Sequence, residues 1–477
     1  MKSHIFSTLM KDIAKNRLTR GYIVRNFDKY LYDKLINNNN CHLQAVQERK
    51  YYFLRAMLHK AVDNLEKGYF SEDMYRNIVD VLVEKAFLGR AYHRDNLEAF
   101  RTEYGMLPPT FIVLSPTQAC NLNCPGCYAS SDPGKSNTLP FHIVDRIIRE
   151  TRDKFHSRFV TISGGEPFLY KSDGKTLLDI FEKYDDMFFL VYTNGSLITP
   201  EIAHRLKESA NVTPAISVEG FEQETDQRRG KGTHKNILKA FGNLRQAGVP
   251  FGISVTATSN NADILLGNEF YEEYFDRQGA IYMWQFQLMP IGRSHHAFQQ
   301  MVPAEKRVQL YRKWEELIME KEYCVADFWN SGVLTNGCIA YGRGGGYLHI
   351  DWNGNIMPCV FVPYYVDNVY DLYENGKTLV DALFSDYMKR GRRWIHEYAL
   401  NDPENPGNLL MPCSIRDHYA NFRNNILTAD ARPENEPARI SLNDEQYYNT
   451  LVEYDQALET LTADIWETEF KNNGQKG

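Results

Sequence analysis

The chain of 477 residues has no apolar run that approaches the roughly 18 residues of a membrane-spanning helix. Its first residues, MKSHIFSTLMKDIAKNR, carry neither the apolar core nor the small-residue cleavage site of a secretory signal peptide. It also lacks an excess of basic residues, because 54 lysines and arginines face 61 aspartates and glutamates, a net charge of −7. These absences predict a cytoplasmic protein and argue against nucleic acid as its main partner.

Cysteine is scarce, and eight cysteines in a chain of this length are too few for a disulfide scaffold. Their positions are uneven: two stand alone, three lie within eight residues, and three are spread through the last third of the chain. In this order they are Cys41 and Cys324; Cys120, Cys124 and Cys127; and Cys338, Cys359 and Cys413. In a reducing compartment such a cluster indicates metal or iron–sulfur ligation.

Hydrophobic patterning divides the chain into a helical region, residues 1–108, an alternating region, 109–295, a mixed region, 296–430, and an acidic tail, 431–477. In the alternating region, six β-rich runs are separated by segments long enough for one helix each. The runs are 111–116, 159–163, 188–193, 212–218, 251–258 and 283–289. This alternation predicts an α/β fold with a parallel sheet and right-handed crossovers. Six units are fewer than the eight of a closed barrel, so we expect a partial barrel with its chemistry at the carboxyl ends of the strands.

Two features of the last third of the chain also predict local structure. The segment YLHIDWNGNIMPCVFV predicts a β-hairpin with Asn353 and Gly354 at its turn. The tail from Asp430 has eleven acidic and four basic side chains, which favours either a solvated helical surface or a mobile tail.

The sharpest motif is Cys-Asn-Leu-Asn-Cys-Pro-Gly-Cys, from Cys120 to Cys127, directly after the first β-run. Three closely spaced thiolates can hold three irons of a 4Fe–4S cluster and leave the fourth iron open to a substrate or cofactor. A structural zinc site with a distant fourth ligand is the alternative, although tight zinc sites usually show paired Cys-x-x-Cys.

This Cys-x3-Cys-x2-Cys pattern, followed after the second β-run by Ser-Gly-Gly-Glu-Pro at 163–167, resembles the radical SAM superfamily over residues 110–295. The resemblance implies that Cys120, Cys124 and Cys127 ligate a 4Fe–4S cluster whose open iron binds S-adenosylmethionine (SAM). It further implies that Gly164, Gly165 and Glu166 receive the methionine amino group, since glycines permit close backbone approach and a carboxylate accepts hydrogen bonds from an ammonium.

The same resemblance assigns three more cofactor contacts. Ser217 and Glu219, at the end of the fourth β-run, would hydrogen-bond the ribose, because the two-residue period of a strand points them the same way. Arg229, in the segment DQRRG, aligns with an arginine that contacts the cofactor carboxylate. A solvated surface arginine is the alternative for this position.

The carboxyl-terminal cysteines form a second pattern, Cys338-x15-Gly354-x4-Cys359, which resembles the opening of a SPASM or twitch extension. Only Cys413 follows, which excludes a full SPASM domain with seven cysteines. The resemblance implies one auxiliary cluster held by Cys338, Cys359 and Cys413, with a non-cysteine side chain, Cys324 or nothing in the fourth position. The alternative is three unrelated buried cysteines.

Together these features predict an enzyme in which a one-electron reductant, such as flavodoxin or ferredoxin, allows reductive cleavage of SAM. The resulting 5′-deoxyadenosyl radical would abstract hydrogen from a peptide, a small metabolite or a lipid. A basic segment at 1–36, with Phe6, Leu9, Met10 and Ile13 on one possible helical face, leaves peripheral membrane contact open beside packing on the protein itself. A non-catalytic metalloprotein that uses the same cysteines is the alternative of a different class.

Overall fold

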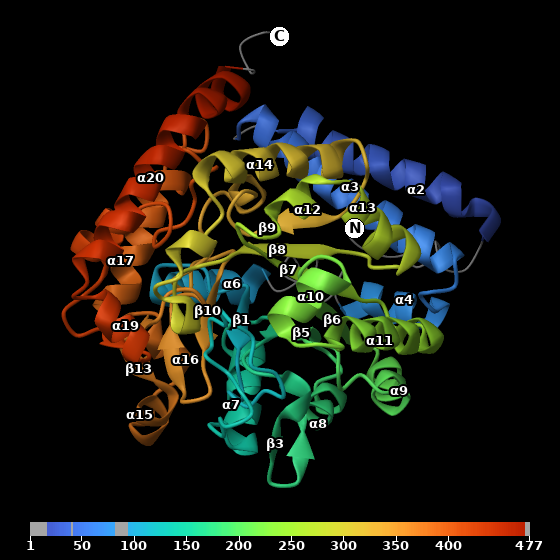
Figure 1. The fold of residues 1–477 in the computed structure, drawn as a ribbon, viewed down its shortest axis with the longest axis horizontal. Coiled ribbons are helices and arrows are strands. Elements are labelled where there is room, and N and C mark those ends of the chain that lie inside the picture. The colour runs from blue at the N-terminus through green and yellow to red at the C-terminus, as the bar shows by residue number, and fades with distance from the viewer. Residues whose placement is uncertain (1–16, 40–41, 82–93, 473–477) are drawn as a thin grey trace.

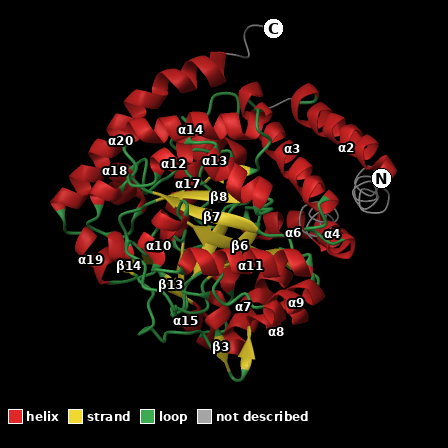
Figure 2. Ribbon diagram, turned by 45° about the vertical axis from the view of Figure 1, so that its right-hand side comes forward, coloured by secondary structure: helices red, strands yellow, loops and turns green. Residues whose placement is uncertain are grey.

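The structure, a computed structural model, describes residues 17–39, 42–81 and 94–472. Its centre is a ten-stranded sheet in the order β13-β11-β10-β1-β2-β5-β6-β7-β8-β9, in which the eight strands from β10 to β9 pair in parallel. β11 and β13 extend one edge in antiparallel pairing. Figure 2 shows this sheet surrounded by helices. The strands are β1 Phe111–Leu114, β2 Phe159–Ile162, β3 Lys171–Ser172, β4 Lys175–Thr176, β5 Phe188–Thr193, β6 Val212–Val218, β7 Gly252–Ala257, β8 Met283–Gln287, β9 Val325–Asp327, β10 Tyr347–Ile350, β11 Asn355–Met357, β12 Tyr364–Tyr365, β13 Asp367–Asn368 and β14 Arg432–Pro433.

All six predicted strands are confirmed, as β1, β2, β5, β6, β7 and β8. Continuous apolar runs such as FFLVYT in β5 form these strands because helices cover both faces of a parallel sheet. The hairpin is also confirmed, since His349 pairs with Met357 and Ile350 with Ile356, while Gly354 takes the positive φ of +80° that the turn needs. The sequence analysis did not anticipate that β9 and β10 continue the parallel sheet, β10 beside β1 and β9 beside β8.

Helices connect the successive parallel strands. α7 buries Ile143, Val144, Ile147 and Ile148 along one face, as the crossover after β1. α11 ends at Ala247, and Gly248 follows with φ +76°, a left-handed conformation that favours glycine at a helix end. The longer helices of this region are α7 Phe141–Asp153, α8 Leu177–Lys183, α9 Pro200–Ser209, α10 Glu222–Arg229, α11 Thr233–Ala247 and α14 Ala304–Met319, and the short turns are η3 Pro167–Leu169, α12 Ala262–Leu266, α13 Glu269–Tyr271, η4 Glu272–Arg277, η5 Gly292–Ser294, η6 Phe298–Gln300 and η7 Gly332–Thr335.

The described part of the amino-terminal region is helical, as predicted, with α2 Arg17–Tyr32, η1 Asp33–Asn37, α3 Gln44–Glu66, α4 Glu72–Ile78 and α6 Arg94–Tyr104. α3 packs against α14, where Arg49 forms an ion pair of 2.6 Å with Glu315. The four apolar side chains of the proposed membrane face, and Cys41, lie outside the described residues. None of the described helices combines the length and apolar character needed to cross a bilayer.

The acidic tail is a packed helix. α20, Glu445–Ile465, lies along α14 at the left of Figure 1 and buries Tyr447, Leu451 and Leu458. Over the described part of the tail, which ends at residue 472, the mobile alternative is therefore wrong, because these apolar side chains recur at helical spacing and are buried. The remaining helices of the last third are α15 Val369–Glu374, α16 Leu379–Ala382, α17 Asp386–Ile395, η8 His396–Leu400, α18 Tyr419–Asn421, η9 Phe422–Ile426, α19 Glu436–Ser441 and η10 Trp466–Lys471.

Candidate functional site

The loop that carries Cys120, Cys124 and Cys127 leaves the carboxyl end of β1 and is held by the segment after β8. The guanidinium of Arg293 donates to the carbonyl of Cys124 at 2.6 Å, and the Arg293 backbone N–H donates to the carbonyl of Cys127 at 3.0 Å. Arg293 therefore holds the loop through its backbone carbonyl groups, and these hydrogen bonds do not involve the cysteine sulfur atoms. Sequence reasoning missed Arg293, because 166 residues separate it from Cys127 and no local pattern links them.

The thiols of Cys120 and Cys124 are partly buried, and nearby charged groups act on them. Burial raises the pKa of Cys120 to about 11, although the backbone N–H of Leu122 donates to its sulfur at 3.4 Å. Burial also raises the pKa of Cys124, while the nearby positive charge of Arg229 lowers it. Metal binding must therefore displace protons from these sulfurs. Across the described ranges, no three His, Cys, Asp or Glu side chains are arranged to hold one metal ion.

Gly164 and Gly165 form a tight turn against the strand end that leads into the cysteine loop. Gly164 has φ +112°, and a Cβ on Gly165 would lie 2.1 Å from the carbonyl oxygen of Ala119. The backbone N–H of Glu166 donates to that same carbonyl at 2.8 Å. Both glycines are thus needed for the backbone of β2's end to approach the residue next to Cys120.

The Glu166 carboxylate is fully buried and joins the ends of two neighbouring strands. It accepts hydrogen bonds from the Thr193 hydroxyl at 2.7 Å, the Asn194 backbone N–H at 2.8 Å and the Phe168 backbone N–H at 3.2 Å. Burial raises the pKa of Glu166, and these hydrogen bonds oppose that shift. The Asn194 side chain continues the chain of contacts by donating to Asn121 of the cysteine loop at 2.8 Å. The hydrogen bonds of Glu166 and Asn194 therefore connect the ends of β2 and β5 to the cysteine loop.

A second carboxylate, Glu219, lies just beyond β6 and is clamped by two arginines. Arg228 donates to it at 2.5 Å and the Nε of Arg229 at 2.8 Å, and Glu219 is only 1% exposed. The Arg229 side chain is only 15% exposed and its charge acts on Cys124, so it is a partly buried residue and not a solvated surface arginine. Arg228, which sequence reasoning did not select, shares this contact. The Ser217 hydroxyl lies 3.2 Å from that of Ser254 on β7.

The structure also brings together Cys338, Cys359 and Cys413. Burial raises the pKa of Cys413 well above its ordinary value, and the nearby Cys338 and Cys359 raise it further. Burial likewise raises the pKa of Cys359, to about 12. Of the described cysteines, Cys324 lies elsewhere, just before β9, where its carbonyl accepts a hydrogen bond from Met283 at the start of β8.

The backbone of Cys413 is supported by a fully buried ion pair between Arg307 and Asp417. The guanidinium donates to both carboxylate oxygens, at 2.6 and 3.2 Å, and Asp417 also accepts the Cys413 backbone N–H at 3.0 Å. Both side chains have zero exposure. Sequence reasoning missed this pair, since 110 residues separate its members.

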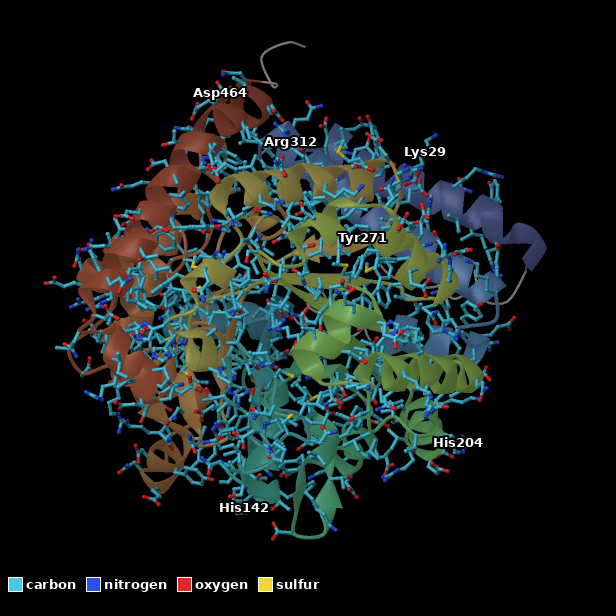
Figure 3. All side chains as sticks on the ribbon, in the orientation of Figure 1. Lys29, His142, His204, Tyr271, Arg312 and Asp464 are labelled. Carbon is cyan, nitrogen blue, oxygen red and sulfur yellow. The ribbon has the colours of Figure 1, made fainter. Side chains whose placement is uncertain are left out.

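We expect Asp417→Asn to lower the free energy of unfolding by about 3–5 kcal/mol, because it leaves the Arg307 charge buried without its counterion. Urea unfolding followed by circular dichroism measures this change. Asp464→Asn is the matched control, since Asp464 lies on the exposed face of α20 (Figure 3). Equal midpoints for the two variants would contradict a stabilising role for the pair.

Residues 114–265 match the family model of the radical SAM superfamily. The mycofactocin maturase MftC of Mycobacterium ulcerans is 29% identical over 339 residues, covering 69% of this chain and 85% of that protein. The AdoMet-dependent heme synthase of Methanosarcina barkeri is 26% identical over 327 residues, covering 61% and 89%, and the sporulation killing factor maturation protein SkfB of Bacillus subtilis is 27% identical over 261 residues, covering 53% and 60%.

Among solved structures, SuiB of Streptococcus suis bound to S-adenosylmethionine has a TM-score of 0.51 at 17% identity, covering 77% of this chain and 87% of that one. This likeness concerns the fold. The segment that matches the family model runs from the end of β1 through the cysteine loop, the Gly-Gly-Glu turn and the Glu219 clamp as far as α12. Residues 114–265 therefore form a radical SAM domain, which implies a 4Fe–4S cluster and SAM as cofactors, and the related maturases and synthases are enzymes.

Proposed function

We propose that the enzyme modifies a peptide by radical chemistry, with one 4Fe–4S cluster held by Cys120, Cys124 and Cys127 and a second held by Cys338, Cys359 and Cys413. The observation that carries the proposal is the contact of the first cysteine loop with the Gly164–Glu166 turn. A structural zinc site or cluster needs no such turn, which disfavours the non-catalytic alternative. Two relatives are named for the maturation of mycofactocin and of a sporulation killing factor, which favours a peptide over a metabolite or a lipid.

The donor sets suit iron–sulfur clusters. In each group a backbone N–H two residues beyond a cysteine points at its sulfur: Leu122 to Cys120 at 3.4 Å, and Phe361 to Cys359 at 3.5 Å. Such hydrogen bonds stabilise a thiolate, the form that binds iron. When bound, the first cluster would supply the electron that cleaves the sulfonium of SAM. The reductant that delivers this electron would be a flavodoxin or ferredoxin.

The surrounding residues would bind and orient the cofactor. The Gly164–Gly165 backbone would accommodate the methionine amino group, and Glu166 would hold that backbone in register with β5. Arg229 would meet the cofactor carboxylate, and Ser217 with Glu219 would face the ribose. Because Glu219 already binds two guanidinium groups, its charge is neutralised and its orientation is fixed before any cofactor arrives.

Aromatic side chains connect the two cysteine groups and would exclude water from a radical. The ring of Tyr128, next to Cys127, lies 6.0 Å from that of Phe361, which in turn lies 5.8 Å from Phe286 and 5.5 Å from Phe328. The Tyr128 hydroxyl lies 2.7 Å from that of Ser163, directly before the Gly-Gly-Glu turn. The proposed substrate position is therefore at the carboxyl ends of the strands, between the two groups.

The test is anaerobic reconstitution with iron and sulfide, followed by reduction in the presence of SAM. We expect about seven to eight irons per chain and formation of 5′-deoxyadenosine. Formation of S-adenosylhomocysteine as the sole nucleoside product would contradict the reaction. To test the substrate class, heat-stable cell extract is added with and without prior protease digestion. Stimulation that digestion abolishes supports a peptide, and stimulation that survives it points to a metabolite or lipid.

We expect Glu166→Gln to raise the dissociation constant of SAM at least about tenfold while the cluster absorbance persists. The amide nitrogen cannot accept a hydrogen bond, so one of the three contacts that fix the turn is lost and an unsatisfied donor is buried. Equilibrium binding to the reconstituted protein measures the change. Glu208→Gln, on the exposed face of α9, should bind SAM as the unmodified protein does. Loss of iron from Glu166→Gln would instead make Glu166 part of the cluster site.

A further inference from the structure

The hydroxyl of Tyr347, the first residue of β10, lies 2.9 Å from the sulfur of Cys359. Tyr347 is 2% exposed, and its ring stacks on Phe111 of β1 at 5.0 Å between centroids and 15° between planes. The hydroxyl is therefore held in place by the packing of the ring within the sheet. The Tyr347 hydroxyl therefore forms a fixed contact with the sulfur of Cys359, and the proposed cleavage of SAM at the first cluster does not require this contact.

Either atom of this contact can donate while Cys359 is a free thiol. Once the sulfur binds iron it has no proton, so the tyrosine hydroxyl must be the donor. The sulfur also accepts the backbone N–H of Phe361 at 3.5 Å. Tyr341 is a natural comparison, because it is buried near the same three cysteines, yet its hydroxyl lies 2.9 Å from Ser414 and not from a sulfur.

A hydrogen bond to a cluster sulfur favours the more negative, reduced state, so it raises the reduction potential. We propose that Tyr347 is a positioning residue that donates to the Cys359 thiolate and raises the reduction potential of the auxiliary cluster, an inference that rests on the proposed second cluster. Tyr347 thereby increases the fraction of the auxiliary cluster that is reduced at a given potential. Cys359 is two residues before Phe361, whose ring lies 6.0 Å from that of Tyr128.

Tyr347→Phe tests the inference, because it keeps the ring that packs on Phe111 and removes only the hydroxyl. The reconstituted full-length protein is titrated potentiometrically and followed by electron paramagnetic resonance. Added SAM perturbs the signal of the first cluster and so identifies the auxiliary signal. At the midpoint potential of the unmodified protein, we expect the reduced-to-oxidised ratio of the auxiliary cluster to fall about tenfold, which corresponds to about 59 mV for one electron. Tyr341→Phe is the matched control, with an unchanged midpoint.

Four outcomes decide the question. A lower midpoint in Tyr347→Phe alone, at unchanged iron content, supports the inference. An unchanged midpoint, or an equal shift in Tyr341→Phe, overturns it while the second cluster stands. Loss of the auxiliary iron from Tyr347→Phe overturns a tuning role and makes the hydroxyl necessary for assembly. An unmodified protein with only four irons overturns both the second cluster and the inference.

Discussion

Replacing Cys120, Cys124 and Cys127 together with alanine is expected to abolish 5′-deoxyadenosine formation and to leave about half of the reconstituted iron. The effect is complete because these thiols are the proposed ligands of the iron that binds SAM, and no other described cysteine lies in this loop. The fold should persist, since Arg293 holds the loop through carbonyl oxygens that the substitutions leave in place. Iron analysis and chromatography of the nucleoside products measure the two effects.

The control for this variant is Cys324→Ala, which removes a buried cysteine outside both groups. It should retain all of its iron and cleave SAM at the normal rate. If the triple variant keeps its full iron content, this loop is not a cluster site. If it loses the iron but still forms 5′-deoxyadenosine, the reaction takes place elsewhere in the molecule.

The second large effect is expected from Cys359→Ala, which should lose the auxiliary iron and turnover of the substrate while SAM cleavage at the first site persists. Cys338 and Cys413 are about 75 residues apart, and closing such a loop costs entropy that iron–thiolate bonds offset. Residues 338–430 should therefore become more sensitive to protease. Limited proteolysis with mass spectrometry, beside iron analysis, measures these changes.

Three results would count against this expectation. Unchanged iron in Cys359→Ala would remove the auxiliary cluster from the proposal. Equal loss of iron from Cys324→Ala would make the site one of four cysteines, although Cys324 lies just before β9, where its carbonyl accepts a hydrogen bond from Met283. Failure of SAM cleavage in Cys359→Ala would show that the two sites do not fold independently.

Those parts of the fold could be predicted whose sequence signal lies within a few neighbouring residues. Each of the six predicted strands is a buried apolar run between turn residues, and the cysteine loop and the Gly-Gly-Glu turn are contiguous in the chain. β9 escaped prediction because three residues carry no recognisable period. β10 was predicted only through its hairpin, since its pairing with β1 joins residues that are 236 positions apart.

The same reasoning separates the residues that could be proposed for the site from the sequence from the partners that could not. Glu166, Glu219 and Arg229 belong to short motifs, so their positions could be proposed from the sequence. Their partners could not: Thr193 and Asn194 reach Glu166 only because β2 and β5 are neighbours in the sheet. Arg293 and Asp417 act through backbone carbonyl and amide groups, which any sequence possesses and no residue pattern reveals.

The pairing of β10 with β1 has a consequence for synthesis on the ribosome. Phe111 pairs with Tyr347, so one edge of β1 has no partner until 236 further residues have been made. At about 5–20 residues per second, that delay is about 12–47 s. During this time the nascent chain exposes an apolar strand edge, the kind of surface that chaperones protect and that aggregates when protection fails. We expect the yield of native enzyme to depend more on chaperone supply during translation than on the stability of the finished fold.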